Sequence, residues 1–469
     1  MKTLLFSLYG LIFIASNFAY PASMNFSGSF RSEASSYTNL GQTAGKESKQ
    51  FIAGRALLDP NLLIDDHFSI RSQWSLLTSP LFTPRASQPL GNGQGGFVFG
   101  DVQTAALNLN RAWLEWTSDF GVVRIGRVPI SWGYGLTWDA GNRVWDDYQT
   151  TDDRLEYRLH LGNVIGAVAY TKARKLSVLE NADDQEFYTV FLQYDNPELD
   201  MEGGIYFEKQ ARSSDINGVT GPSTLAADSS NPFGQDPNTP PAQQTPLRNS
   251  TPYPKNNNAV DVYLKKTTGR FTFGGEVTWL TGKAYDLGGD GVDDDLNAFG
   301  AMGNITFAYH KLKIFTEVVY ATGDKETKDN SSTAFSLLHL NRARPGLILG
   351  RELLGLYHGN NVGQGNLMVY GQTDAFSGLL FARPGVRIDW SPSWASGVEV
   401  IIAKKAATKE GENADLGWEI DLGTDYNVYK NFDMGLNLGL AFPGKGIPLP
   451  TGGEQKNIFA VRTTAALKF

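Results

Sequence analysis

Apolar and polar residues alternate along most of the chain, and this period of two constrains the fold more than any other feature of the sequence. In one segment the apolar positions are Leu416, Trp418, Ile420, Leu422, Tyr426 and Val428. The same alternation recurs at residues 155–161, 260–265 and 432–442. Because successive side chains of a β-strand point to opposite faces, each segment predicts a strand with one apolar and one polar face. Residues 103–117 carry both kinds of residue on both faces, and the pattern assigns that strand no orientation.

The connections between these strands alternate between short turns and long polar loops. Short turns are expected at residues 59–61, 118–119, 162–163, 196–197, 268–269, 310–311, 391–392 and 430–431, and long loops at 38–49, 78–101, 129–153, 173–184, 210–257, 283–297, 323–373, 406–414 and 443–456. Soluble sandwiches and propellers have no reason to sort loop lengths by side, whereas outer-membrane barrels do. The sequence therefore predicts an all-β fold, a closed transmembrane antiparallel up-and-down β-barrel of about 18 strands with both termini periplasmic.

Composition removes several other classes of protein. A mean hydropathy of −0.27 and the lack of a long apolar stretch beyond the first residues exclude a bundle of membrane-spanning helices. The 469 residues include no Cys, which excludes disulfides, zinc–thiolate sites and a Cys nucleophile. A formal net charge of −8 lacks the basic surface of a nucleic-acid binder, so no nucleic-acid partner is expected.

Both ends of the chain carry export signals. Lys2, the apolar residues 4–15 and the small residues near 19–23 have the features of a secretory signal peptide. We therefore expect residues 1–22 to be a signal peptide. Residues 23–469 are expected to be one barrel in the outer membrane of a Gram-negative cell, with long external loops, notably 129–153, 210–257 and 323–373. The last strand has Phe459, Val461, Ala465, Leu467 and Phe469 on one face. A terminal aromatic residue after such a strand resembles the signal for outer-membrane barrel assembly, which makes the barrel assembly machinery an expected partner.

The polar face of the alternation predicts the residues that line the lumen. The selected pore-lining residues are Arg124, Arg154, Glu156, Arg158, Asp261, Lys265, Glu317, Arg383, Arg387, Asp389, Glu419 and Asp421. Charges of both signs are not buried dry without close pairing, and a barrel of this size is wide enough to hold water. These residues therefore form either the wall of an aqueous channel or a salt-bridged shell around an inserted loop.

The aromatic segment at residues 126–148 is the most distinctive motif. Its rings are Trp132, Tyr134, Trp138, Trp145 and Tyr148, and its Gly-x-Gly spacing suits a tight loop packed by aromatic side chains. The rings could form a stacking platform for sugars. The alternatives, which the pattern favours, are that they fold the loop onto the barrel mouth or belong to the interfacial aromatic girdle.

Two segments resemble a known family of barrels. Residues 126–148 with Thr151, Asp152, Asp153 and Arg154 are similar to the strand-and-loop signature of the myxobacterial-type outer-membrane β-barrel family. In this first segment Ile130 and Ser131 stand where the family has a more polar lead-in. Residues 341–355 look like the conserved apolar patch of the same family. The resemblance implies an outer-membrane barrel and names no substrate.

Three of the loops have unusual compositions. The loop 323–373 is apolar at its centre, so we expect it to pack into the lumen as a constriction or partial plug, with contact to another protein as the alternative. The loop 210–257 is polar and aperiodic, as surface loops are. Asp290, Asp293 and Asp295 lie in an acidic, Gly-rich segment that offers oxygen ligands for Ca²⁺. Because their spacing does not match an EF-hand, a solvated acidic loop is favoured over a Ca²⁺ site. A third interpretation is that divalent ions bridge these carboxylates to lipopolysaccharide phosphates.

These observations predict a porin-like passive diffusion channel for small hydrophilic solutes. Outer-membrane lipid and lipopolysaccharide are the expected surroundings of the barrel. A homo-oligomer is expected by analogy with porins. No cofactor is expected apart from structural Ca²⁺. A plugged structural or adhesive barrel is the main alternative. An outer-membrane hydrolase is less favoured and the chain is not expected to be an enzyme, because its five His residues form no recognisable triad spacing.

Overall fold

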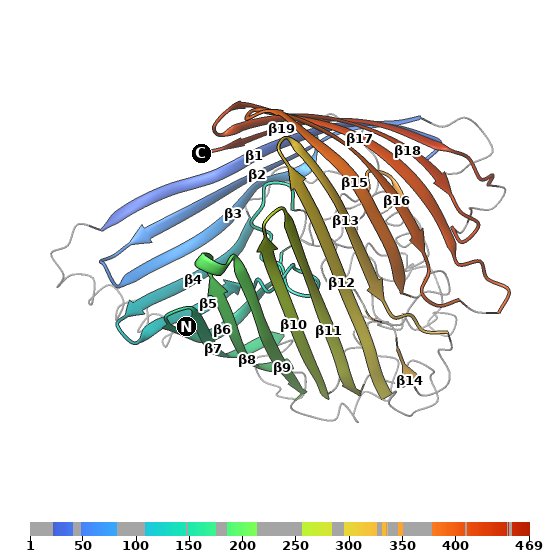
Figure 1. Ribbon diagram of the computed structural model, residues 1–469. Helices are drawn as coiled ribbons and strands as arrows, with labels where there is room; N and C mark the ends of the chain where they lie inside the picture. Colours follow the sequence, from blue (N-terminus) through green and yellow to red (C-terminus); the bar gives the residue numbers. More distant parts are fainter. Residues whose placement is uncertain are drawn as a thin grey trace, which may run out of the picture.

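The computed structural model describes residues 22–40, 48–81, 108–146, 149–174, 185–212, 256–283, 295–325, 331–333, 335, 346–349, 378–408, 410–447, 449 and 453–469. Figure 1 shows long tilted strands that curve around one interior. No helix in these parts of the chain is long and apolar enough to cross a membrane. The predicted signal peptide and most of the loop 210–257 lie outside the described residues.

The strands are long and follow one another in sequence order. They are β1 (Ser23–Thr38), β2 (Ser48–Leu63), β3 (Phe68–Leu81), β4 (Asn108–Ser118), β5 (Gly121–Pro129), β6 (Thr151–Leu161), β7 (Val164–Arg174), β8 (Gln185–Asn196), β9 (Met201–Arg212), β10 (Asn256–Thr268), β11 (Phe271–Lys283), β12 (Asp295–Tyr309), β13 (Leu312–Ala321), β14 (Ser331–Ser332), β15 (Leu379–Ser391), β16 (Trp394–Lys404), β17 (Asp415–Tyr429), β18 (Phe432–Pro443) and β19 (Ile458–Lys468). A short 3-10 helix, η1 (Pro197–Leu199), lies in the turn between β8 and β9.

Eighteen of these strands form a closed antiparallel barrel. The remaining strand, β14, has two residues and pairs in parallel with β12. The barrel closes where β1 meets β19, with Ser29 opposite Lys468 and Thr38 opposite Phe459. The backbones of Gly28 and Phe469 also exchange hydrogen bonds of 2.9 and 3.1 Å. The predicted closed barrel of about 18 strands is therefore confirmed.

Short turns and long loops separate to opposite ends of the barrel, as predicted. Seven of the eight expected turns lie between consecutive strands. The turn expected at residues 59–61 is wrong, because β2 runs on to Leu63 and the chain turns at residues 64–67. Pro60 lies opposite Phe26 of β1, at a point where the ladder from β2 to β3 is interrupted between Leu58 and Asn61. A strand tolerates proline where a ladder hydrogen bond is not needed.

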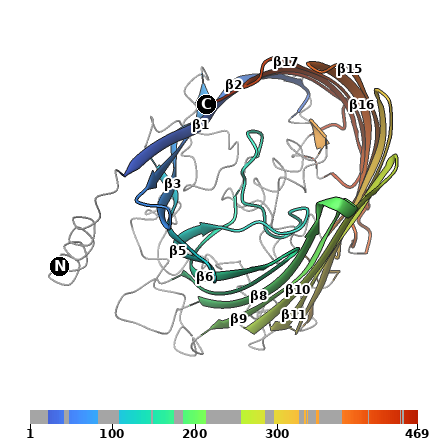
Figure 2. The same cartoon turned by 60° about the vertical axis from the view of Figure 1, so that its left-hand side comes forward.

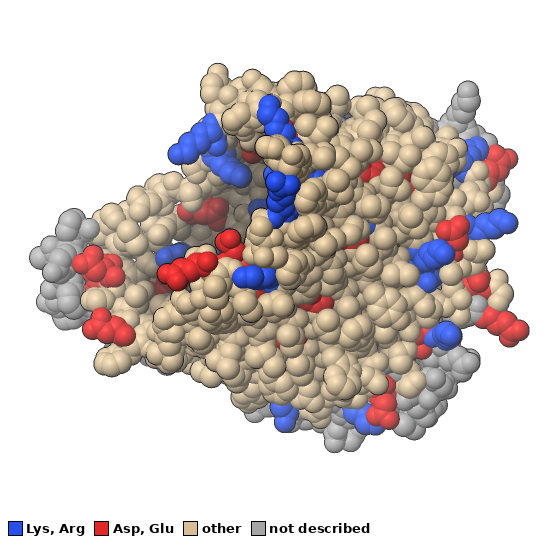
Figure 3. All heavy atoms as spheres, viewed as in Figure 1, with Lys and Arg blue, Asp and Glu red and all other residues tan. Residues whose placement is uncertain are grey.

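The outer face of the barrel is apolar. On β6, for example, Leu155 and Tyr157 point outward with 49% and 37% of their surface exposed, whereas Arg154 and Glu156 between them are buried inside. Figure 3 shows the broad middle of one outer face almost free of charged side chains, while the hollow in the same view holds charges of both signs. This arrangement is that of a protein with lipid outside and a polar lumen within.

The alternation breaks at one place on β17. Trp418, Ile420 and Leu422 face outward as predicted, but Leu416 is 1% exposed and belongs to the interior apolar cluster. The cause is Gly417, which has a φ of +104° beside an irregularity in the pairing of β16 with β17. A bulge of this kind turns the preceding side chain to the other face.

Candidate functional site

The lumen wall carries all twelve residues predicted to line the pore. Their positions alternate with outward-facing apolar side chains on β5, β6, β10, β13, β15 and β17. Most are buried rather than open to a wide channel: Arg124, Arg154, Glu156, Asp261, Glu317, Glu419 and Asp421 are each less than 9% exposed. Arg158, Lys265, Arg383, Arg387 and Asp389 keep more exposed surface.

One carboxylate organises the arginines on the β5–β6 wall. Glu156 Oε1 lies 2.9 Å from Arg124 Nη1 and 2.5 Å from Arg158 Nε, and its Oε2 lies 3.2 Å from Arg154 Nη2. Glu115 on β4 adds a second partner for Arg124 at 3.8 Å. Close pairing of this kind is what allows so many charges to be buried together.

The opposite part of the wall holds more exposed ion pairs. Arg383 Nη2 lies 3.0 Å from Glu317 Oε1, and Arg387 Nη1 lies 2.9 Å from Asp425 Oδ2. Lys313 Nζ lies 2.8 Å from Asp389 Oδ2. Side chains in the last two pairs are about half exposed or less, and they face the lumen toward the short-turn end.

The segment between β5 and β6, described at residues 130–146, 149 and 150, crosses the barrel interior. Figure 2 shows it leaving the wall and running through the lumen. We call it the inward loop. Its two ends stay paired, with a hydrogen bond of 3.0 Å from Ile130 N to Thr150 O. Leu136, Thr137 and Ala140 within it are at most 2% exposed. The inward loop is therefore part of the interior and not an external loop as predicted for residues 129–153.

Acidic side chains of β10 and β11 hold one side of the inward loop. Glu276 accepts hydrogen bonds from the backbone amides of Tyr134 at 2.5 Å and Leu136 at 3.1 Å. Asp261 accepts from Trp132 Nε1 at 2.8 Å. These two buried carboxylates therefore contact the loop and not a solute.

Arginines of β1, β2 and β4 hold the other side. Arg31 Nη1 donates to Val144 O at 2.9 Å, and Arg55 Nη2 donates to the same oxygen at 3.2 Å. Arg111 Nη1 donates to Ala140 O at 3.1 Å and its Nη2 to Asn142 Oδ1 at 2.9 Å. The loop thus presents amide donors to an acidic wall and carbonyl acceptors to a basic wall.

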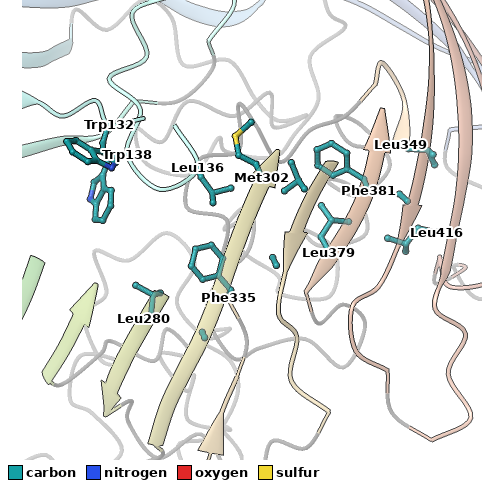
Figure 4. Packing of buried hydrophobic residues seen from close by; sticks show 14 of the residues in the cluster. Trp132, Leu136, Trp138, Leu280, Met302, Phe335, Leu349, Leu379, Phe381 and Leu416 are labelled. Carbon is teal, nitrogen blue, oxygen red and sulfur yellow. The ribbon is translucent and has the colours of Figure 1, made fainter. Parts of the chain in front are cut away.

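The aromatic residues of the inward loop pack against the barrel. Trp132 is 3% exposed, with ring centroids 5.4 Å from Phe191, 5.3 Å from Tyr206 and 5.0 Å from Tyr263. Trp138 is 6% exposed and lies 4.2 Å from Tyr206, and Figure 4 shows both indoles beside each other. Because their faces are covered, these two rings have no open surface for a sugar. Trp145 is 40% exposed, and Tyr148 lies outside the described residues.

A second inward segment, residues 346–349, contacts the wall at β17. Glu419 accepts from the amides of Leu347, Ile348 and Leu349 at 2.7–2.8 Å, and Asp421 Oδ2 accepts from Leu347 N at 2.8 Å. Consecutive amides that converge on a carboxylate form a backbone nest. The three side chains are at most 2% exposed. At these residues the apolar centre of the loop 323–373 therefore lies inward, as predicted, and most of that loop is outside the described residues.

Glycines of the lumen wall receive the inward side chains. Trp132 packs on Gly204, Tyr134 on Gly274 and Phe335 on Gly300, so that a Cβ at any of these three glycines would collide with the inward side chain. At Gly439 a Cβ would collide with Asp421 and lie 3.1 and 3.2 Å from Leu347 and Ile348. The alternation did not predict these positions. One sequence signal could have indicated them. A glycine on the polar face of a strand, where the alternation predicts a polar side chain, marks a place where another segment can pack closely on the wall.

The five His residues and the acidic segment are not brought together in the described part of the chain. His67, His160 and His310 lie at the short-turn end, and His339 and His358 are not described. Among the described residues no group of three or more His, Asp or Glu side chains could hold a metal ion. Asp295 pairs with Lys283 across β11 and β12, whereas Asp290 and Asp293 are not described.

Comparison with known proteins identifies the fold. No family model and no curated protein matches the sequence. Among solved structures, a BenF-like porin from Pseudomonas fluorescens Pf-5 is 9% identical with a TM-score of 0.53, and the match covers 95% of this chain and 98% of that one. OpdK from Pseudomonas aeruginosa, solved with vanillate, is 10% identical with a TM-score of 0.51 over the same shares. The chain has the porin-type barrel fold. The similarity does not extend to the myxobacterial-type family, and that resemblance stays a prediction.

Proposed function

We propose that this protein is a porin-like channel of the outer membrane through which small hydrophilic solutes diffuse passively. Three features support the proposal: a closed barrel, an apolar outer face, and an interior wall with charged side chains of both signs. Barrels of 16–18 strands are wide enough to leave an aqueous lumen. No step of chemistry is needed for this activity, only a path of suitable width and polarity.

The inward loop is the single observation that carries the proposal. This loop is fixed at both walls by directed hydrogen bonds, which satisfy the polar groups that it carries into the lumen. Fixing a segment across the lumen gives a constriction of constant geometry, which is how a passive channel selects solutes by size and polarity. The segment 346–349 narrows the interior further from the β17 wall.

The remaining expectations belong to the same proposal. The short-turn end of the barrel, which carries both termini, faces the periplasm. Residues 1–22 are removed as a signal peptide. The barrel assembly machinery recognises the last strand, which ends at Phe469. The aromatic motif and residues 341–355 support a relationship to the myxobacterial-type family. Lipopolysaccharide surrounds the outer rim of the barrel. Ca²⁺ bound at the acidic segment around Asp290, Asp293 and Asp295 would bridge these carboxylates to lipopolysaccharide phosphates. The barrels associate as a homo-oligomer.

Single-channel recording in planar bilayers tests the proposal. Purified protein should give discrete conductance steps. Replacing residues 131–149 by a four-residue Gly-Asn-Gly-Ser turn should raise the conductance several-fold, because Ile130 and Thr150 are already paired and a short turn can join them. Shortening the loop 213–255 is the control and should leave the conductance near the wild-type value. Folded protein that gives no steps in either form would overturn the proposal.

A plugged structural or adhesive barrel is the second candidate. It is favoured by one observation, the apolar cluster inside the lumen, which joins Trp132, Leu136, Phe335, Ile348 and Phe381. A dry cluster of this kind fills space that a wide pore would leave to water. Under this function the folded wild-type protein gives no conductance steps, and only removal of the inward loop opens the lumen.

A further inference from the structure

The turns at the short-turn end of the barrel carry opposite charges on its two halves. The turns that follow β2, β4, β6 and β8 form one half, which we call the acidic arc, and its charged or titratable residues are Asp65, Asp66, His67, Asp119, Glu198 and Asp200. The turns that follow β10, β12, β15 and β17 form the other half, which we call the basic arc, and its residues of this kind are Arg270, His310, Lys311 and Lys430. In Figure 3 red side chains gather at the left edge of the hollowed end and blue ones at its upper edge.

The cations of the basic arc are not neutralised by the protein. Arg270, Lys311 and Lys430 are exposed, and none of them has a carboxylate oxygen within 4.0 Å in the described part of the chain. Arginines of the lumen wall differ in this respect, as the pair of Arg383 with Glu317 at 3.0 Å shows. The charge of the lumen is therefore largely balanced internally, whereas the charge of the basic arc is left for a partner.

The basic arc lies beside aromatic side chains that face outward. Tyr309 and Trp390, near the ends of β12 and β15, are 43% and 45% exposed. Arg270 Cζ lies 4.4 Å from the ring centroid of Tyr309, and Lys311 Nζ donates to Trp390 O at 2.8 Å. Aromatic rings at the end of a membrane-spanning segment mark the depth of the lipid headgroups. Two cations of the basic arc are therefore held at headgroup depth.

The acidic arc has outward-facing apolar side chains as well. Trp116, Phe120 and Leu161 at this arc are 41%, 79% and 64% exposed. The membrane therefore meets both arcs, and the difference between them is the sign of their charge. Cations near a membrane surface attract anionic headgroups, and carboxylates in the same place repel them.

We propose that the basic arc binds the phosphate headgroups of anionic phospholipids in the leaflet that meets the short-turn end, and that the acidic arc excludes them. The guanidinium of Arg270, over the ring of Tyr309, would donate to phosphate oxygens in the paired geometry that arginine favours. Lys311 and Lys430 add point charges on neighbouring turns. The barrel thus gathers anionic lipid on one side only. This inference goes beyond the proposed channel function and does not depend on conduction through the lumen.

Photoactivatable lipids test the proposal on the full chain in mixed vesicles of phosphatidylcholine and phosphatidylglycerol. One probe is phosphatidylglycerol and the other is phosphatidylcholine, each with its reactive group near the headgroup, and peptide mass spectrometry locates the label. We expect phosphatidylglycerol to label the basic arc at least about threefold more than the acidic arc, after division by the phosphatidylcholine signal. Raising the salt from about 0.1 M to about 1 M shortens the screening length from about 10 Å to about 3 Å and should remove the preference. Equal labelling of the two arcs by phosphatidylglycerol at low salt would overturn the proposal.

A triple variant tests which residues are responsible. Arg270→Gln with Lys311→Gln and Lys430→Gln should bring phosphatidylglycerol labelling of the basic arc down to that of the acidic arc. The three side chains are exposed, so the barrel should still fold. A preference that survives in the folded triple variant would place the lipid elsewhere and overturn the proposal.

A matched control separates position from net charge. Lys209→Gln with Lys404→Gln and Lys445→Gln removes the same number of charges from exposed lysines at the long-loop end, and it should leave labelling of the basic arc unchanged. Loss of the preference in this control would show an effect of net charge alone. A second copy of the chain is the other occupant to test, with a carbodiimide that joins amines to carboxylates without a spacer. Links from the basic arc of one copy to the acidic arc of another, in place of lipid labelling, would also overturn the proposal.

Discussion

At the scale of single residues, Glu156 shows how the wall tolerates its arginines. It is 1% exposed and pairs with Arg124, Arg154 and Arg158, of which Arg154 is itself 4% exposed. Removing the one partner of a buried charge costs more than the pair contributes, because the remaining charge is left without compensation in a poorly solvated place.

Glu156→Gln should therefore lower the free energy of unfolding by about 3 kcal/mol. Urea or guanidinium unfolding in lipid vesicles measures the change. Asp153→Asn is the matched control on the outer face of the same strand, where the ion pair with Arg127 is about half exposed. It should cost less than about 1 kcal/mol. Equal losses for the two variants would show that the cluster around Glu156 is as well solvated as the surface.

Gly274 illustrates a residue that acts by having no side chain. A Cβ at this position would overlap the ring and hydroxyl of Tyr134. Gly274→Val should destabilise the protein by about 1–3 kcal/mol, since overpacking forces the inward loop to shift. The same denaturant titration measures it. Gly303→Val should be close to neutral, because the nearest atom to a Cβ there is 4.0 Å away. A neutral Gly274→Val would mean that Tyr134 does not rest on this wall.

At the scale of elements, the inward loop and β11 are joined closely enough to be cross-linked. Thr137 Oγ1 lies 2.8 Å from Thr278 Oγ1, and both residues are at most 1% exposed. The chain has no Cys of its own, so two introduced thiols have no competing partners.

The double variant Thr137→Cys with Thr278→Cys should form a disulfide on mild oxidation. Thiol labelling after denaturation counts the free cysteines, and none should remain. Thr137→Cys with Thr281→Cys should stay reduced, because residue 281 lies on the opposite face of β11. Two free thiols in the first variant would place the loop away from β11.

The elements also show which loop the sequence could identify. The apolar centre of residues 323–373 predicted a segment that packs into the lumen. The described part of that centre, residues 346–349, lies there. The aromatic loop carried no comparable signal, because its rings favoured packing on the barrel mouth or a place in the girdle, and neither puts them inside the lumen. Its burial depends on Asp261 and Glu276, more than a hundred residues away in sequence.

At the scale of the whole molecule, the two faces of each strand meet different surroundings. Trp418 and Tyr426 on β17 are both outward and eight positions apart, which is about 26 Å along a strand at about 3.3 Å per residue. Strands of such barrels tilt by about 35–45°, so the two rings are roughly 20 Å apart along the barrel axis, which fits within an apolar band about 25 Å tall.

Val190→Arg should therefore destabilise the protein in lipid by about 2–4 kcal/mol, because Val190 faces outward near the middle of β8 with half of its surface exposed. Gln193→Arg is the control on the lumen face of the same strand, beside Glu202, and should cost less than about 1 kcal/mol. Folding in lipid vesicles measures both. An equal cost would contradict lipid outside and polar lumen within.

The sequence by itself determined the barrel, its strand number, seven of its eight short turns and the sides on which its charged residues lie. These features are local, because alternation and turn chemistry are set by neighbours in the chain. Only the tertiary structure decided that the inward loop crosses the lumen and that Asp261 and Glu276 hold it. Those outcomes depend on contacts between distant strands, such as Trp132 with Asp261, which no local pattern encodes.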